Sequence, residues 1–122
     1  MPRFVILLHE TPPGSSRASH YDLMLEQGDA LWTWACESLP EHGKAVTAER
    51  LPDHRLAYLD YEGPVSDDRG SVRRVASGSF DRLAATDGQV RVQLTGDAFR
   101  GELLLTRDSA ATNRWSASLL LT

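Results

Sequence analysis

Three residues near the N-terminus have the types and spacing that hold a divalent metal ion. Side chains of a β-strand alternate between its two faces, so His20 and Asp22 would share one face of a strand over residues 20–26. His9 ends the apolar run 4–8 and would lie beside His20 if the two strands were neighbours in one sheet. Two imidazoles and one carboxylate leave coordination positions open, as a catalytic metal requires. We therefore expect His9, His20 and Asp22 to form a metal site.

Short β-strands are the elements that must hold these side chains in place. Apolar or alternating segments are separated by clusters of Pro, Gly, Ser and Asp, and helical periodicity is scarce. The expected strands cover residues 3–9, 20–26, 31–36, 44–50, 71–80, 89–95, 101–107 and 114–121. This pattern predicts an all-β fold, a compact barrel of roughly eight strands with little helix. A short helix over residues 45–51 stays open as an alternative.

The chain is the right size for one domain with one core. Its 122 residues are enough to bury roughly two-thirds of the surface of the unfolded chain, so we expect a single domain over residues 1–122. The side chains expected to fill the barrel are Val5, Leu7, Leu23, Leu25, Trp32 or Trp34, Val90, Val92, Leu94, Leu103 and Leu105.

Charge and cysteine content exclude several classes of protein. The net charge of −4 argues against coating nucleic acid through bulk electrostatics, although recognition of a single phosphate is still allowed. Cys36 is the only cysteine, so no intrachain disulfide can form. The N-terminal apolar run is too short for a signal peptide and far shorter than the ~20 residues of a membrane span. We expect a cytoplasmic protein with no membrane partner.

Several segments, taken in order, resemble the 3′-phosphoesterase domain of bacterial DNA ligase D, which also occurs as a stand-alone protein. The similarity runs through residues 4–9, 20–26 and 32–35 and is densest at 53–63. It weakens through residues 70–80 and returns at 90–107. The resemblance implies a compact β-barrel and a manganese-dependent hydrolase of DNA repair. Such an enzyme removes a terminal ribonucleoside and then the 3′-phosphate from DNA or RNA primer ends.

The resemblance also assigns roles to individual residues. The metal ligands of the family fall on His9, His20 and Asp22, the same three residues that strand alternation brings together. A further histidine and a tyrosine that engage the phosphate fall on His54 and Tyr58. The implied cofactor is Mn²⁺ or another divalent metal. The implied partners are nucleic-acid 3′ ends and a separate DNA ligase or polymerase.

The sequence departs from the family pattern at positions that matter for phosphate binding. Met24 stands where the family strand carries an arginine, and a second expected arginine falls on Val46. Losing one donor aimed at the phosphate typically lowers the rate by about 10²–10³. We expect Arg17 to bind phosphate in their place, with Lys44 and Arg50 as alternatives. A weakened module that binds a nucleic-acid end or a protein partner without turnover is therefore an alternative function, and a small phosphorylated substrate is a third.

Other residues of the same types are expected to be structural. His42 lies in a turn and should simply be solvated. Tyr61 is expected to pack as a core or strand-edge aromatic. The cluster around Arg69, with Arg73 and Arg74, is expected to be a solvated mixture of charges.

Overall fold

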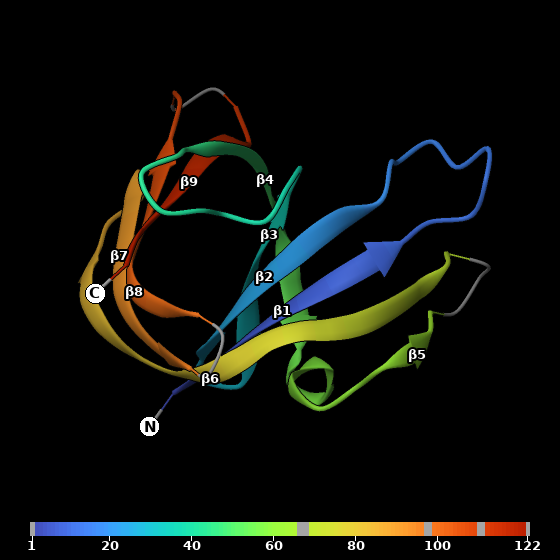
Figure 1. Cartoon of the computed structure of the whole chain (residues 1–122), viewed down its shortest axis with the longest axis horizontal. Coiled ribbons are helices and arrows are strands. Elements are labelled where there is room, and N and C mark those ends of the chain that lie inside the picture. Colours follow the sequence, from blue (N-terminus) through green and yellow to red (C-terminus); the bar gives the residue numbers. More distant parts are fainter. Residues whose placement is uncertain (1, 66–68, 97–98, 110–111, 122) are drawn as a thin grey trace.

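The chain forms a closed antiparallel β-barrel (Figure 1). The computed structural model describes residues 2–65, 69–96, 99–109 and 112–121 of the 122. Within these ranges the elements are β1 (Arg3–Glu10), β2 (His20–Gln27), β3 (Ala30–Cys36), β4 (Val46–Arg55), η1 (Leu56–Leu59), β5 (Gly63–Pro64), β6 (Ser71–Ala85), β7 (Gln89–Gly96), β8 (Arg100–Arg107) and β9 (Arg114–Leu121). Strands pair in the order β1-β2-β3-β4-β9-β8-β7-β6, and β6 pairs with β1 to close the ring.

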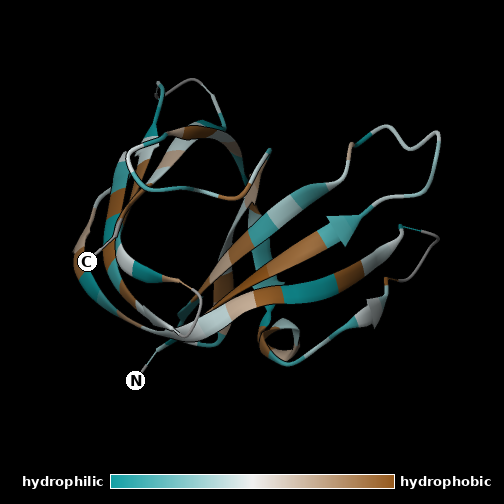
Figure 2. Cartoon of the chain, viewed as in Figure 1, coloured by the Kyte–Doolittle hydropathy of each residue, from teal (hydrophilic) through white to brown (hydrophobic). Residues whose placement is uncertain are grey.

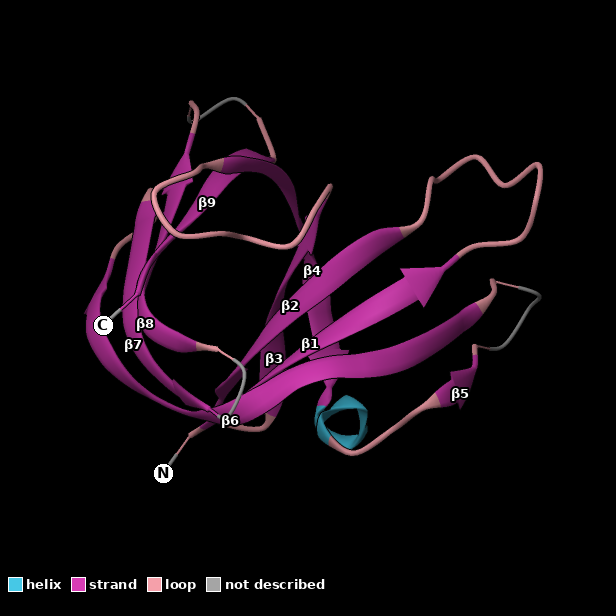
Figure 3. Cartoon of the chain, in the orientation of Figure 1, coloured by secondary structure: helices cyan, strands magenta, loops and turns pink. Residues whose placement is uncertain are grey.

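The predicted all-β class and the barrel are confirmed. All the predicted strands are present, but β4 continues to Arg55 and β6 to Ala85, past their predicted ends. The alternative of a helix over residues 45–51 is wrong, because this segment pairs with both β3 and β9. In the described part of the chain, the 3-10 helix η1 is the only helix (Figure 3). No helix within the same residues is long and apolar enough to cross a membrane.

One face of each of the eight barrel strands fills the interior. Most of the residues predicted to lie there do so: Leu23, Leu25, Trp34, Val90, Val92, Leu94, Leu103 and Leu105. The prediction is wrong for Val5 and Leu7, which point to the outer face, while Phe4 and Ile6 take the interior positions of β1. The run from 4 to 8 is apolar throughout, so its sequence does not reveal which residues point inward.

A second, smaller core covers the outer face of the barrel wall. This outer core consists of Val5, Leu7, Met24, Leu31, Leu59 and Val72. Leu59 belongs to η1, which lies over this face and shields it from water. Burial of β1 on both faces explains its unbroken apolar run. In Figure 2 the apolar body of β1 gives way to hydrophilic residues at its end, where His9 lies next to the outer core.

A β-bulge in β4 decides which way the end of this strand faces. Leu51 pairs with Thr33 and His54 pairs with Leu31, so three steps along β4 match only two along β3. The extra residue shifts the alternation by one position. His54 therefore points to the same outer face as Leu51, although strict alternation would have turned it to the opposite face. Pro52 lies within the bulge, where a residue without a backbone N–H is tolerated.

Candidate metal and phosphate site

His9, His20 and Asp22 converge on the outer face of the barrel wall. His9 and His20 are directly opposite each other in the register of β1 and β2, and Asp22 follows two residues later on the same face. One nitrogen from each histidine and a carboxylate oxygen of Asp22 all lie within 4.8 Å of one another. The two imidazole rings are 4.8 Å apart between centroids and meet at 61°. Strand register alone thus assembles the predicted trio.

Backbone carbonyls fix the protonation pattern of both imidazoles. His20 Nδ1 lies 2.8 Å from the Ala18 carbonyl oxygen, and His9 Nε2 lies 2.7 Å from the Arg69 carbonyl oxygen. A carbonyl can only accept, so these nitrogens carry the protons in the neutral rings. The lone pairs are left on His20 Nε2 and His9 Nδ1, which are the nitrogens that face Asp22. Metal-ligating histidines are held in this way in proteins.

Asp22 is buried between the two imidazoles, with 3% of its surface exposed. Its Oδ1 lies 3.0 Å from His20 Nε2 and its Oδ2 lies 3.4 Å from His9 Nδ1. Burial raises the pKa of Asp22, but the contacts with His20 and His9 outweigh it and hold that pKa below its usual value. Oδ1 nevertheless has no hydrogen-bond partner in the described residues. An ionised carboxylate with a bare buried oxygen beside two imidazole lone pairs fits a divalent transition metal.

A glycine lets the Arg69 carbonyl reach His9. Gly70 has a φ of +93°, and a Cβ at this position would lie 1.9 Å from the Glu10 carbonyl oxygen. Only glycine permits both the backbone conformation and the close approach to the end of β1. The Asp22 carboxylate raises the pKa of His9, and the hydrogen bond to Arg69 adds to this effect against the opposing effect of burial.

All six residues predicted for the site line a single cavity, the site cavity, of about 620 Å³. These residues are His9, Arg17, His20, Asp22, His54 and Tyr58. The bulge in β4 turns His54 toward the cavity, and η1 carries Tyr58 close to it, with 5.6 Å between the ring centroids. His54 Nδ1 donates to the Pro52 carbonyl oxygen at 2.9 Å, which leaves Nε2 for a ligand. The roles of these residues stay predictions.

Comparison with known protein families identifies the family of this chain. Residues 14–107 match the family described as the DNA ligase D 3′-phosphoesterase domain. The chain belongs to this family. Membership supports a 3′-phosphoesterase role in general and is consistent with the use of a metal ion at the His/Asp group. His9 lies before the matched residues, so its place in the site comes from the strand register. No match was found among curated proteins.

The two positions at which the resemblance to the ligase D family predicts an arginine lie outside the site cavity. Met24 is 1% exposed and packs in the outer core. Val46 faces the barrel interior, where it contributes to the main core. Neither position of this chain can therefore present a charge to a phosphate.

Arginines from other elements line the site cavity instead. Arg17, on the loop between β1 and β2, forms an ion pair with Glu49 at 3.0 Å, and both side chains are about half exposed. Arg55 at the end of β4 and Arg69 also line the cavity, although the sequence pattern indicates no role for Arg55 and predicts a solvated charge for Arg69. Its place next to His54 at the end of a strand is the sequence feature that could have identified Arg55 as a site residue. Of the alternatives, Arg50 lies over the ring of Trp34 and not in the cavity lining.

Proposed function

We propose that this protein is a metal-dependent 3′-phosphoesterase that trims terminal ribonucleosides and phosphates from primer ends in DNA repair. The observation that carries the proposal is the site cavity, in which the metal-ligand trio faces His54 and Tyr58. Mn²⁺ is the proposed metal, since the donor set fits a divalent transition metal and the family resemblance points to manganese. We place the protein in the cytoplasm, working with a separate DNA ligase or polymerase.

The chain's own residues can bind and orient a 3′-phosphate group. A divalent ion held by His9, His20 and Asp22 would offset charge on the phosphoryl oxygens and lower the pKa of a bound water. Protonated His54 can donate from Nε2 to a phosphate oxygen or to the leaving oxygen, because Nδ1 is engaged by the Pro52 carbonyl. The Tyr58 hydroxyl offers a second donor from η1.

Arg17 is the residue best placed to replace the missing arginines. It lines the site cavity, and its present partner Glu49 is on β4. An ion pair between half-exposed side chains is worth less than about 1 kcal/mol. A phosphate dianion can therefore draw the guanidinium away from Glu49 at little cost, and guanidinium binds phosphate through two hydrogen bonds.

The test is a primer-end assay. Purified protein is incubated with primers that end in a ribonucleotide or in a 3′-phosphate, with Mn²⁺, Mg²⁺, Zn²⁺ or a chelator. We expect Mn²⁺-dependent removal of both groups. His20→Ala should lower kcat/KM at least about 100-fold, because it removes a metal ligand whose outer-sphere partners alone are worth 10–100-fold. His42→Ala is the matched control, a histidine outside the site cavity that should retain activity.

Met24 is buried at a position where the family resemblance predicts an arginine, so the chain lacks that donor to a phosphate. This favours a second candidate function, the binding of a primer end without turnover. An intact primer in every metal, together with metal-dependent binding that His20→Ala abolishes, would support this binding module and reject the esterase. Product formation that persists in His20→Ala would reject the proposed site.

A further inference from the structure

A small side pocket opens beside the site cavity. It encloses about 230 Å³ and is lined by Arg55, Ala57, Tyr58, Tyr61, Pro64 and Val65. Arg55 and Tyr58 line the site cavity as well, so the two spaces adjoin. Pockets for whole small molecules are usually about 300–1,000 Å³, so the side pocket suits one ring system of a larger ligand.

Aromatic rings lead from the site into the side pocket. The His54 and Tyr58 centroids are 5.6 Å apart, and the Tyr58 and Tyr61 centroids are 5.8 Å apart with the rings nearly perpendicular, at 88°. Tyr61 is 37% exposed, although its hydroxyl donates to the Pro64 carbonyl oxygen. That hydrogen bond holds the Tyr61 ring in place at the wall of the side pocket. We had expected Tyr61 to be structural only.

The lining chemistry fits a nucleobase. Tyrosine rings and an arginine guanidinium are the groups on which unpaired bases stack in proteins that bind single strands. Ala57, Pro64 and Val65 supply apolar walls, and Arg55 supplies the guanidinium. None of the described lining residues is acidic, so nothing there repels the nearby phosphate.

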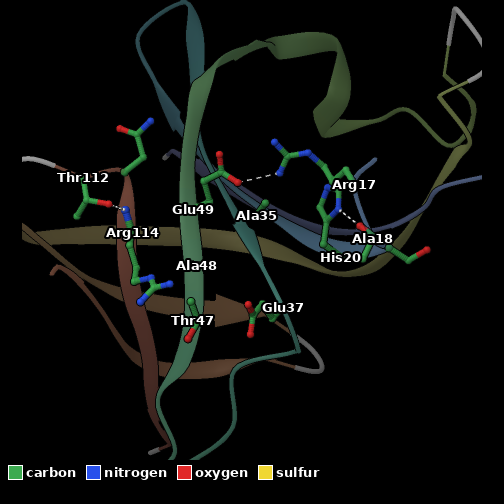
Figure 4. Close-up of a pocket in the computed structure, with 12 residues that line it drawn as sticks. Arg17, Ala18, His20, Ala35, Glu37, Thr47, Ala48, Glu49, Thr112 and Arg114 are labelled. Atoms are coloured by element: carbon green, nitrogen blue, oxygen red, sulfur yellow. Dashed lines mark hydrogen bonds and ion pairs between the residues drawn. The ribbon is translucent and has the colours of Figure 1, made fainter. Parts of the chain in front are cut away.

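A second cavity adjoins the site cavity, shares no lining residue with the side pocket and indicates which nucleoside the side pocket would hold. It measures about 630 Å³ and shares Arg17 and His20 with the site cavity. Figure 4 shows Arg17 reaching across it to Glu49 on β4. A substrate cut near its 3′ end has a long retained strand on one side of the phosphate and a single nucleoside on the other. By size, the second cavity suits the strand and the smaller side pocket suits the single nucleoside.

We infer that the side pocket binds the base of the 3′-terminal nucleoside, the group that leaves, through Tyr61 with Tyr58 and Arg55. This inference rests on the proposed function and adds the element that distinguishes nucleoside removal from phosphate removal. A 3′-phosphate end has no base beyond the phosphate and does not use the pocket. The terminal base increases kcat/KM for nucleoside removal and contributes nothing to phosphate removal.

The test compares ratios within one protein preparation, so partial misfolding cancels. For the wild type, Tyr61→Ala and Tyr61→Phe, kcat/KM is measured on primers ending in a ribonucleoside, in an abasic sugar and in a 3′-phosphate. Tyr61→Ala should lower the ratio of nucleoside removal to phosphate removal by about 5- to 150-fold, the range for loss of one stacked base. Tyr61→Phe keeps the ring and should retain most of that ratio. The wild type should discriminate against the abasic end by a similar factor.

Binding measurements separate failure of this inference from failure of the proposed function. Fluorescence anisotropy with Mn²⁺ gives the Kd of base-bearing and abasic ends without any need for turnover. Equal affinity and equal kcat/KM for the two ends, or an unchanged ratio in Tyr61→Ala, overturns the base pocket and leaves the esterase intact. Discrimination in binding that Tyr61→Ala removes supports the pocket even if no product forms, a result that would reject the esterase alone.

Discussion

At the residue scale, the site depends on where the protons of His9 and His20 are held. Each ring donates a hydrogen bond to a backbone carbonyl on the side away from Asp22. The ring nitrogens that face Asp22 therefore carry lone pairs and no proton. Without a metal, a protonated imidazole can donate to the buried carboxylate. With a metal, both rings must be neutral. Protons and metal ions therefore compete for the same three side chains.

This competition predicts opposite pH dependences of stability. The pKa of His9 is raised from 6.5 in the folded state, so its contribution is fully present below pH 6.5 and is lost as the pH rises through the raised value. The free energy of unfolding in chelator should thus fall as the pH rises above 6.5, because His9 loses the proton that pairs it with the buried Asp22 carboxylate. The increase in the free energy of unfolding that Mn²⁺ causes should become larger over the same pH range. Urea unfolding with and without Mn²⁺ measures both.

His9→Gln is the control for the pH experiment, because it removes the imidazole whose pKa is raised. The difference between wild type and His9→Gln isolates the contribution of His9. Identical pH slopes in chelator for the two proteins would show that His9 and Asp22 do not interact as the structure has them.

At the element scale, a glycine before β6 and a β-bulge in β4 position polar groups of the site. Gly70 allows the segment before β6 to approach β1, and the bulge in β4 turns His54 outward. Neither feature is regular secondary structure, yet each places one polar group in the site.

Gly70→Ala should loosen the metal site without touching a ligand. The added Cβ would lie 1.9 Å from the Glu10 carbonyl oxygen at a φ of +93°, so the backbone must shift and move the Arg69 carbonyl away from His9. Loss of such an outer partner typically weakens metal affinity by about 10–100-fold. Isothermal titration with Mn²⁺ measures this. Gly88→Ala is the matched control, since its Cβ meets nothing within 4 Å. Equal affinities in the two variants would contradict a positioning role for Gly70.

The sequence predicted the parts of the site that depend on regular alternation. His20 and Asp22 share a face because β2 is regular, and His9 joins them through simple pairing of β1 with β2. The outward turn of His54 could be placed only through family resemblance, because the bulge breaks the alternation of β4; Pro52 was the one local signal. The place of Arg69 depends on a long-range contact between its carbonyl and His9, which no local pattern encodes.

At the scale of the whole molecule, the interior core and the candidate site lie on opposite faces of one barrel wall. The interior core draws on all eight barrel strands, whereas the outer core draws on β1, β2, β3, β6 and η1 and adjoins the site. An arginine at position 24 or 46 would enter one of these two cores, whereas the arginines that line the site cavity lie on loops and at a strand end.

Two leucine truncations should separate the two faces. Leu105→Ala in the interior and Leu59→Ala in the outer core each remove a buried side chain, so each should lower the free energy of unfolding by about 2–5 kcal/mol. Only Leu59→Ala frees η1, which carries Tyr58. It should therefore lower kcat/KM, or primer-end affinity if there is no turnover, by about 10- to 100-fold at a temperature where both variants are folded. Mn²⁺ affinity should be retained in both, because β1 and β2 hold the ligands. Equal losses of function in the two variants would mean that η1 does not position Tyr58 for the substrate.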